Sequence, residues 1–384
     1  MRRWTIRRKR TTLAAMVAAG SVTLLLHGCG AGGGGGDAPP GTYQMGGARQ
    51  GVALNLAATV ATIAGRAGAP GFIDGSGTAA RFFYPQGLTT DGANLYVADY
   101  GNHTIRKLAI DGSAVTIVAG APLIEGSVDA IGTAARFRSP AGLTTDGRFL
   151  YVADRGNHSI RKIAIGTWEV VTLAGTTLPG FVDGAGSAAR FNFPTGITTD
   201  GTSLFVADTN NHTIRKIAIG TGAVTTLAGQ AGSSGFADGV GAAARFSFPY
   251  ALTTDGVNLY VADTDNHTIR RIAIGTGAVT TLAGQAGSSG FADGIGASAR
   301  FSFPSAITTD GTSLYVADSN NFIIRKIAIA TGAVSTLAGT PGAAGSADGT
   351  GATAQFRPYP SGLTTDGRDL FVNDSGNHTV RLMR

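Results

Sequence analysis

Six copies of one short motif, about 55 residues apart, constrain the fold of this chain more than any other feature. Each copy reads Leu, Tyr or Phe, Val, Ala or Asn, and Asp. The aspartates that end the copies are Asp99, Asp154, Asp208, Asp263, Asp318 and Asp374. A repeat of this length is typical of propellers, solenoids and arrays. The content of each unit chooses among these architectures.

Each unit is predicted to hold four short β-strands. The strands are rich in Val, Ile, Thr and Tyr, and Asp-Gly pairs mark tight turns between them. In the first unit the predicted strands cover residues 85–90, 94–98, 104–110 and 114–119. No long amphipathic helix is evident. Four strands per repeat predict the blade of an all-β, six-bladed β-propeller.

The two ends of the repeat region predict how the ring closes. Residues 59–65 match the fourth-strand pattern seen at 224–229, whereas the last unit reaches Arg384 after its third strand. We therefore expect the N-terminal strand to complete the C-terminal blade, which protects both strands from edge-to-edge aggregation. The predicted propeller domain covers residues 52–384.

The N-terminus predicts export. Six basic residues lie within the first ten positions, and residues 13–26 are uncharged and mostly apolar. This stretch fits a signal peptide over residues 1–28 and is short for a membrane-spanning helix. The segment 26–29, Leu-His-Gly-Cys, resembles the lipobox of bacterial lipoproteins, although His27 departs from the usual small residue. The alternative is an ordinary secretory peptide with a chance cysteine.

Cys29 is the only cysteine in the chain and stands where a lipid would be attached. A glycine-rich stretch follows, and residues 29–51 are predicted to be a flexible tether. The resemblance implies a protein that is lipid-anchored to the cell envelope, and Gly30 permits sorting to the outer membrane, on its periplasmic or its surface face. The membrane contact would be made through the lipid alone.

The charge balance argues against a nucleic-acid partner. The chain has 30 Lys and Arg against 24 Asp and Glu, but six of the basic residues lie in the predicted signal peptide. The mature chain is then formally neutral. A nucleic-acid binder should show a basic footprint, so we expect no nucleic-acid partner. We also expect the protein to be a monomer.

The repeat can now be compared with a known family. Pro-x-Gly-Leu, Asp-Gly, Leu-Tyr-Val-Ala-Asp-x-x-Asn-His-x-Ile-Arg-Lys-Ile and Gly-Ala-Val-x-Thr-Leu-Ala-Gly together resemble the NHL repeat, over essentially the whole predicted domain. The resemblance implies a six-bladed propeller that serves as a binding platform. Some relatives bind RNA or proteins and a few are enzymes, such as the amidating lyase. Fold alone does not decide among these functions.

The repeated aspartates are interpreted as structural rather than catalytic. An arginine stands seven residues after each aspartate and, if Asp99 faces Thr104 across the turn, lies on the same face one diagonal away. These arginines are Arg106, Arg161, Arg215, Arg270, Arg325 and Arg381. We expect each Asp and Arg to form an ion pair.

The histidines of the domain all occupy one repeat position. They are His103, His158, His212, His267 and His378, and the fifth unit has Phe322 instead. A ring of histidines on adjacent blades could bind a metal. The turns should radiate outwards and keep the side chains apart, so the structural interpretation is preferred.

A long connection precedes each unit and has one Asp in an Asp-Gly pair in most copies. Its aspartates are Asp74, Asp129, Asp183, Asp238, Asp293 and Asp348. A calcium loop needs several spaced oxygen ligands, so a turn with a short helical segment over 78–82 is the preferred interpretation. We expect these connections on the same face as the Asp turns. Phe72, Phe181, Phe236 and Phe291 are either exposed anchors there or plugs between loops.

The position after the first proline of each unit varies most and should ring the mouth of the central channel. Its residues are Gln86, Ala141, Thr195, Tyr250, Ser305 and Ser361. Such variation fits either a recognition surface or neutral drift. Tyr250 is the best single candidate for a binding anchor, since aromatic residues dominate binding hot spots.

The sequence therefore predicts a non-catalytic module that binds or scaffolds a protein or glycan, with no cofactor. The alternative is a calcium-dependent hydrolase of the lactonase-like kind, which by resemblance would hold calcium through Glu, Asn and Asp. No matching set is evident, and Glu125 and Glu169 lie off the repeat. The possibility of a single calcium ion bound in the channel is left open. A third possibility is a structural surface protein without a specific ligand, because residues 223–249 and 278–304 differ at only two positions.

Overall fold

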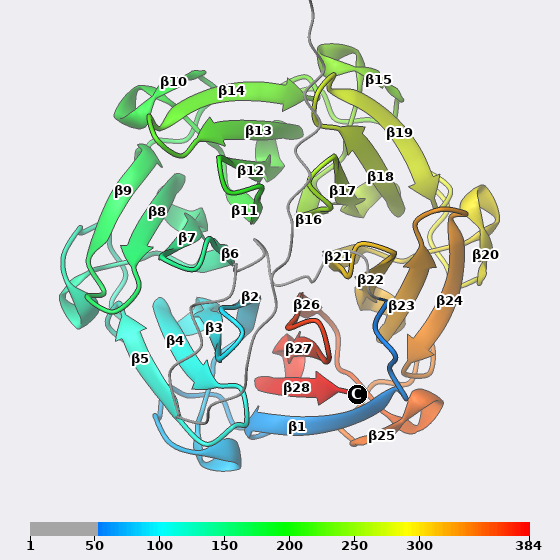
Figure 1. Ribbon diagram of the computed structural model, residues 1–384, viewed down its shortest axis with the longest axis horizontal. Helices are drawn as coiled ribbons and strands as arrows, with labels where there is room; N and C mark the ends of the chain where they lie inside the picture. Colours follow the sequence, from blue (N-terminus) through cyan, green and yellow to red (C-terminus); the bar gives the residue numbers. More distant parts are fainter. Residues whose placement is uncertain (1–52) are drawn as a thin grey trace, which may run out of the picture. The chain divides into compact units, whose positions relative to one another are not determined.

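The computed structural model describes residues 53–384, which form six antiparallel sheets around a central axis (Figure 1). The predicted signal peptide, Cys29 and the tether lie outside the described residues. The all-β, six-bladed propeller predicted from the repeat is confirmed.

The strands of each blade run in order from the centre to the rim. Blade one is β2 (Pro85–Thr90), β3 (Asn94–Asp99), β4 (Thr104–Ala109) and β5 (Val115–Ala119). Blade two is β6 (Pro140–Thr145), β7 (Phe149–Asp154), β8 (Ser159–Ala164) and β9 (Val170–Gly175). Blade three is β11 (Pro194–Thr199), β12 (Ser203–Asp208), β13 (Thr213–Ala218) and β14 (Ala223–Ala228).

The remaining blades follow the same plan. Blade four is β16 (Pro249–Thr254), β17 (Asn258–Asp263), β18 (Thr268–Ala273) and β19 (Ala278–Ala283). Blade five is β21 (Pro304–Thr309), β22 (Ser313–Asp318), β23 (Ile323–Ala328) and β24 (Ala333–Ala338). Blade six is β26 (Pro360–Thr365), β27 (Leu370–Asp374), β28 (Thr379–Met383) and β1 (Thr59–Gly65).

Ring closure follows from β1, which lies beside β28 in the sixth sheet (Figure 1). Ala61 pairs with Leu382 and Thr62 with Arg381 in an antiparallel register. The prediction that residues 59–65 complete the C-terminal blade is confirmed. The first and last blades are thereby joined by main-chain hydrogen bonds.

One end of the ring gathers the repeat's signature residues. In blade one, Pro85 at the start of the inner strand lies opposite Asp99 at the end of β3. A one-turn 3-10 helix follows that aspartate and ends at His103, whose φ of 58° is left-handed. These helices are η2 (Tyr100–Asn102), η4 (Arg155–Asn157), η6 (Thr209–Asn211), η8 (Thr264–Asn266), η10 (Ser319–Asn321) and η12 (Ser375–Asn377). We call this end the mouth face.

The long connections do not gather on the mouth face, contrary to the expectation from sequence. Each runs along the outer edge of a blade to its far end and back, as Gly184 pairing with Val224 at the start of β14 shows. Four of them add a short outer strand: β10 (Gly184–Ala185), β15 (Gly239–Val240), β20 (Gly294–Ile295) and β25 (Gly349–Thr350). Each also contains a 3-10 turn: η1 (Gly77–Ala79), η3 (Gly132–Ala134), η5 (Gly186–Ala188), η7 (Gly241–Ala243), η9 (Gly296–Ser298) and η11 (Gly351–Thr353).

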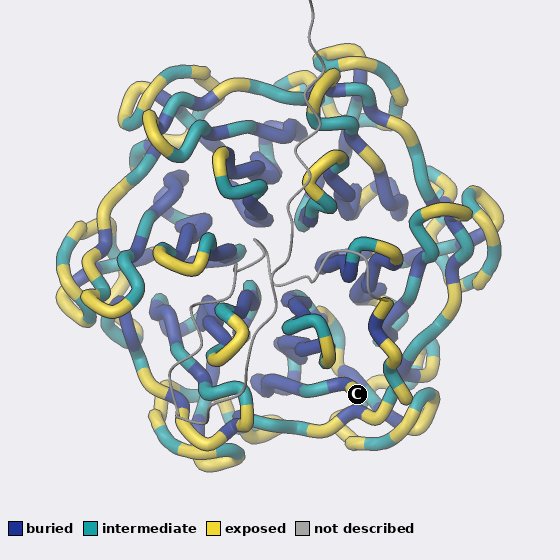
Figure 2. Tube along the Cα trace, viewed as in Figure 1, coloured by how far each residue is buried: buried dark blue, intermediate teal, exposed yellow. Residues whose placement is uncertain are grey.

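The hydrophobic core lies between adjacent blades. One cluster, for example, joins Phe205 and Ile214 of blade three to Leu252 and Val261 of blade four. Figure 2 shows the inner strands buried and the outermost loops exposed. Because each blade is stabilised by its neighbours, the repeat must keep these faces constant all round the ring.

No helix within residues 53–384 is long and apolar enough to cross a membrane.

Candidate functional site at the mouth of the central channel

The inner strands of all six blades line a central cavity of about 70 Å³. Its outermost ring is the variable position predicted from sequence: Gln86, Ala141, Thr195, Tyr250, Ser305 and Ser361. The next ring is Gly87, Gly142, Gly196, Ala251, Ala306 and Gly362. The third ring is Leu88, Leu143, Ile197, Leu252, Ile307 and Leu363. The cavity therefore has a polar mouth above an apolar floor.

The second ring explains why the channel is narrow. A Cβ added to Gly142 would collide with the carbonyl oxygen of Thr195 in the next blade. The inner strands thus approach one another as closely as their backbones allow. A cavity of this volume holds a few water molecules or one small group of a ligand, so any larger ligand must lie at the mouth.

A second set of residues stands beside the outermost ring, at the position that follows each repeated aspartate. In blade three, the hydroxyls of Thr195 and Thr209 lie 2.5 Å apart. The Thr209 hydroxyl also donates to the carbonyl oxygen of Pro249 in the next blade, at 2.8 Å. The same bond from Thr264 to Pro304 measures 2.7 Å. Ser319 and Ser375 make the equivalent bonds to Pro360 and Pro85.

Blades one and two break this pattern. Where the other blades have Thr or Ser, they have Tyr100 and Arg155. Arg155 donates from Nη1 to the hydroxyl of Tyr100 at 3.2 Å, and its guanidinium lies 4.9 Å from the ring centroid of Phe193. These two side chains reach from the turns of adjacent blades toward one another.

Tyr250 and Gln86 meet across the channel. They belong to blades four and one, and the Tyr250 hydroxyl donates to Oε1 of Gln86 at 3.2 Å. Burial raises the pKa of Tyr250, and the nearby Arg155 offsets only part of this shift. The phenol is therefore a neutral hydrogen-bond donor. The side chain predicted as the best anchor lies at the centre of the mouth.

Aromatic side chains at the position before each proline form a wider ring on the mouth face, around the ring of variable residues that lines the cavity. They are Tyr84, Phe193, Phe248, Phe303 and Tyr359, and blade two has Ser139 instead. All six residues have positive φ, between 48° for Phe248 and 70° for Tyr359. A bulky residue in this region is strained. The strain recurs in every blade, so the surrounding structure imposes it.

The repeated histidines hold this aromatic ring in place. Nδ1 of His212 accepts a hydrogen bond of 3.2 Å from the backbone N–H of Phe248 in the next blade. The two rings meet edge to face with centroids 4.7 Å apart. His103, His158, His267 and His378 accept the equivalent bonds from Ser139, Phe193, Phe303 and Tyr84. The histidines are thus links between blades.

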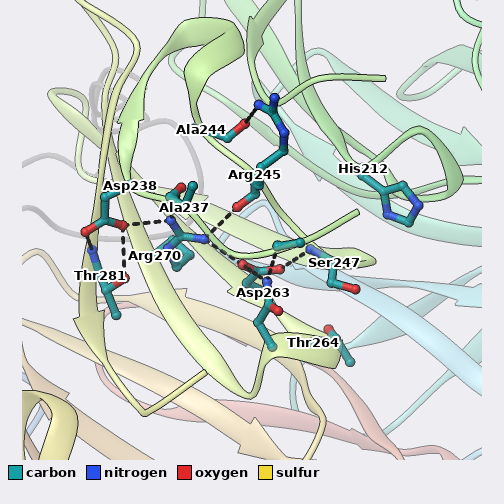
Figure 3. Close-up of polar contacts among 12 residues, drawn as sticks. His212, Ala237, Asp238, Ala244, Arg245, Ser247, Asp263, Thr264, Arg270 and Thr281 are labelled. Atoms are coloured by element: carbon teal, nitrogen blue, oxygen red, sulfur yellow. Dashed lines mark hydrogen bonds and ion pairs between the residues drawn. The ribbon is translucent and has the colours of Figure 1, made fainter. Parts of the chain in front are cut away.

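Below the mouth face, each repeated arginine is held between two aspartates, as Figure 3 shows for Arg270. Arg270 donates from Nη1 to Asp263 at 2.8 Å and from Nη2 to Asp238 at 2.7 Å. Asp263 is fully buried, whereas the Asp238 side chain is about half exposed. The other blades repeat this arrangement with Arg106, Arg161, Arg215, Arg325 and Arg381. We call it the Asp–Arg–Asp triad.

The triad fastens the outer connection to the blade. Asp263 also accepts from the backbone N–H of Ser247 and from Asn266, while Asp238 accepts from the hydroxyl of Thr281 on the outer strand. Burial raises the pKa of Asp263 to about 6, although Arg270 beside it favours the charged form. At neutral pH the carboxylate is ionised and fully engaged.

Three of the four exposed phenylalanines predicted in the connections contact these arginines. Phe181, Phe236 and Phe291 lie with ring centroids 4.7, 4.7 and 5.1 Å from the guanidinium carbons of Arg215, Arg270 and Arg325. One face of each ring therefore covers a buried cation. The rings of Phe181, Phe236 and Phe291 nevertheless stay between 41% and 45% exposed, so this contact decides neither of the two alternatives that the sequence left open.

The comparisons with known proteins agree with the repeat. The NHL repeat family model matches residues 137–163. Human NHL repeat-containing protein 2 is 30% identical over 306 residues, which cover 70% of this chain and 42% of that protein. The chain belongs to the NHL-repeat propellers. Arabidopsis thaliana SUPPRESSOR OF QUENCHING 1 is 32% identical over 293 residues, covering 68% of this chain and 26% of that protein. The chain thus spans less than half the length of these relatives.

Solved structures share the fold of this NHL propeller. A Bacteroides thetaiotaomicron protein of unknown function has a TM-score of 0.65 at 22% identity, covering 85% of this chain and 75% of that chain. An auxiliary nutrient binding protein from the same organism has a TM-score of 0.63 at 17% identity, covering 85% and 76%. At these identities the likeness concerns the fold alone.

The mouth of this NHL propeller does not fit a calcium ion. Calcium takes six to eight oxygen ligands, commonly including carboxylates. The residues that line the cavity offer hydroxyls, backbone carbonyls and one amide, and none of them is Asp or Glu. No group of three or more His, Cys, Asp or Glu side chains within residues 53–384 is placed to hold a metal. Glu125 instead pairs with Arg138 at 3.1 Å on the surface.

Sequence reasoning placed the outermost ring at the cavity but missed Tyr100 and Arg155. A signal was present, because the residue after each repeated aspartate reads Tyr, Arg, Thr, Thr, Ser and Ser. It also missed Asp238 and its equivalents as the second partners of the arginines. Those aspartates lie 32 residues away in most blades, so no local pattern joins them.

Proposed function

We propose that this chain is an exported protein, lipid-anchored to the cell envelope through Cys29, whose NHL propeller is a non-catalytic binding module for a protein or glycan. It acts as a monomer, without a nucleic-acid partner or cofactor. The mouth face is the binding surface. The tether of residues 29–51 gives the propeller reach from the membrane.

The ring of aromatic residues around the mouth is the main support for this proposal. Four of its members have exposed fractions between 36% for Phe303 and 61% for Tyr359, and they surround the polar mouth of the cavity. Fixed aromatic side chains provide large contact area at little cost in conformational entropy. The histidine contacts and the positive φ values hold the rings in place before any ligand arrives. Such preorganisation favours binding.

Two further observations support a binding role. The residues of the mouth differ from blade to blade, while the triads beneath them do not. In addition, one solved protein of this fold is an auxiliary nutrient binding protein. Variable residues on a rigid scaffold are the usual basis of recognition.

A photo-cross-linking experiment in intact cells tests the binding surface. A photoreactive amino acid placed at Phe248 should capture a partner, because this residue is exposed on the mouth face. The matched control is Val257, which is 69% exposed in the turn that follows the opposite end of the same inner strand. Equal capture at both positions, or none at Phe248, would contradict the proposed surface.

Metal content separates this proposal from the calcium-dependent hydrolase. The full chain should be purified in calcium-containing buffer, desalted and analysed by elemental mass spectrometry. We expect no stoichiometric metal, because no carboxylate lines the cavity. About one ion per chain would support a channel site and the hydrolase alternative instead.

The lipid anchor is tested separately. Cys29→Ser removes the only cysteine of the chain, so the protein should lose metabolic labelling by a palmitate analogue and leave the membrane fraction. A variant that stays membrane-bound would show that the N-terminal segment anchors the protein in another way.

A further inference from the structure

Four side chains at the mouth depart from the repeat and lie together: Gln86, Tyr100, Arg155 and Tyr250. In the same blade, the residue after the proline and the residue after the aspartate are neighbours, as Thr195 and Thr209 show. Tyr100 therefore stands beside Gln86 in blade one. By the same rule, Arg155 stands beside Ala141, whose small side chain leaves room at the rim. Tyr250 reaches this group from the opposite blade.

Arg155 is a cation without an anion. Each repeated arginine has two aspartates, and Arg138 has Glu125, but no carboxylate lies within ion-pair distance of Arg155 in the described part of the chain. Its Nε is buried without a hydrogen-bond partner. Its contacts are the Tyr100 hydroxyl and the ring of Phe193, both of which are neutral.

The neighbours of Arg155 supply donors rather than charge. The Tyr100 hydroxyl accepts from Arg155 and keeps its own proton to donate. Gln86 accepts from the Tyr250 hydroxyl through Oε1, which leaves the Gln86 amide N–H₂ as a donor. The replacement of Thr or Ser by Tyr100 and Arg155 also removes two of the hydroxyl bonds that link the other blades. The fold gains no ion pair in exchange, so these residues are explained better by a ligand than by packing.

We infer that this cluster binds the carboxylate of a small acidic ligand, an inference that rests on the proposed binding role of the mouth face. The planar guanidinium of Arg155 matches a carboxylate in a two-point hydrogen bond. The Tyr100 hydroxyl, which accepts from Arg155 and keeps its own proton, and the Gln86 amide supply further donors to its oxygens. One cation surrounded by neutral donors suits a single negative charge better than a doubly charged phosphate.

The aromatic residues around the mouth form a surface on which the rest of the ligand can pack. Phe193 lies under the guanidinium, and Phe248 stands at the start of the strand that carries Tyr250. The cavity below is too small for more than the carboxylate group itself. The ligand body therefore lies across the mouth, which fits either an acidic sugar or the C-terminus of a peptide.

Calorimetric titration of the full chain in detergent tests the inference with two pairs of probes. D-glucuronate is compared with D-glucose, and N-acetyl-alanine with N-acetyl-alaninamide, so each pair differs mainly in a negative charge. We expect one acid of the two to bind at millimolar concentration or better, and its neutral counterpart to bind at least about 10-fold more weakly. The acid that binds identifies the source of the carboxylate.

Variants locate the site. R155T should lower the affinity for the acid at least about 10-fold, and Y250F should lower it several-fold. The control R138T removes a cation that already has a carboxylate partner and should leave affinity unchanged. Failure of both acids to bind, tighter binding of inorganic phosphate, or full binding by R155T would overturn the inference. None of these outcomes would prevent cross-linking of a partner at Phe248, so the two proposals fail separately.

Discussion

Blades four and five and blades one and two use the same repeat in different ways. The segments that lead into blades four and five, residues 223–249 and 278–304, differ at two positions only. Their arginines, Arg270 and Arg325, each pair with two equivalent aspartates at 2.7 to 2.9 Å. Blades one and two keep this triad and yet replace the small hydroxyl residue at the mouth with Tyr100 and Arg155.

The comparison separates folding from recognition within one repeat. The triads and the core between blades recur in all six blades, and the histidine links recur in five of them. The mouth residues can change because they line the channel and lie outside the hydrophobic core between blades. Fold and site are therefore encoded at different positions of the same 55-residue unit. This division makes different predictions for the two kinds of position.

The largest effect is expected from breaking a triad. Asp208→Ala leaves the buried Arg215 without the carboxylate that lies 2.7 Å from its Nη1. The loss of one partner of a buried ion pair costs about 3–5 kcal/mol. The melting temperature should fall clearly, and the same should hold for the equivalent residue of any blade. It is measured by circular dichroism or calorimetry.

The half-exposed aspartate of the same triad is the control. Asp183 also pairs with Arg215, but 47% of its side chain is exposed, so water can replace the lost interaction in Asp183→Asn. We expect about 1 kcal/mol or less. An unchanged melting temperature for Asp208→Ala, or equal losses for both variants, would contradict the structural role given to the buried aspartate.

A smaller effect is expected from the histidine links, and blade five provides the natural comparison. Phe322 stands there with the same left-handed φ, at 62°, and offers no acceptor. His212→Phe therefore keeps the ring and removes only the hydrogen bond from the Phe248 N–H. The expected loss of stability is about 1 kcal/mol.

This loss should depend on pH. Burial lowers the pKa of His212 from its ordinary value of 6.5, and Asp265 nearby offsets only part of that shift. The neutral ring is favoured by the fold, so its contribution is complete above about pH 6.5 and disappears as the pH falls through the lower pKa of the folded protein. The raised pKa of the triad carboxyl Asp208 acts in the opposite direction. The stability difference between wild type and variant isolates the histidine, and a difference that grows on acidification would refute this link.

The sequence predicted what depends on neighbouring residues and missed what depends on neighbouring blades. The strand over 59–65 and the pairing of Asp99 with Thr104 follow from local patterns, and both are present. The bond from Phe248 to His212 joins two blades across 36 residues, so it requires the geometry of the ring. The predicted position of the long connections on the mouth face was wrong for the same reason. Asp238 holds them against the outer strand through Arg270 and Thr281, which no pattern in the connection itself shows.

The smallest change in stability is expected at the mouth, where the comparison between blades can be reversed. Arg155→Thr gives blade two the residue that Thr209 and Thr264 provide in blades three and four. The new hydroxyl can donate to the carbonyl oxygen of Pro194, as Thr209 does to Pro249. It replaces a partly buried cation that has no counter-ion. We therefore expect an unchanged or slightly higher melting temperature, and a free energy of unfolding within about 1 kcal/mol of the wild-type value.

The reciprocal variant completes this test. Thr264→Arg removes the hydroxyl that bonds to Pro304 at 2.7 Å and places a cation in a regular blade. It should destabilise the propeller by more than Arg155→Thr does, because the room that Ala141 leaves beside Arg155 is filled by Tyr250 in blade four. Equal effects of the two substitutions would mean that the mouth tolerates any residue. Blades one and two would then differ from the others by drift and not for recognition.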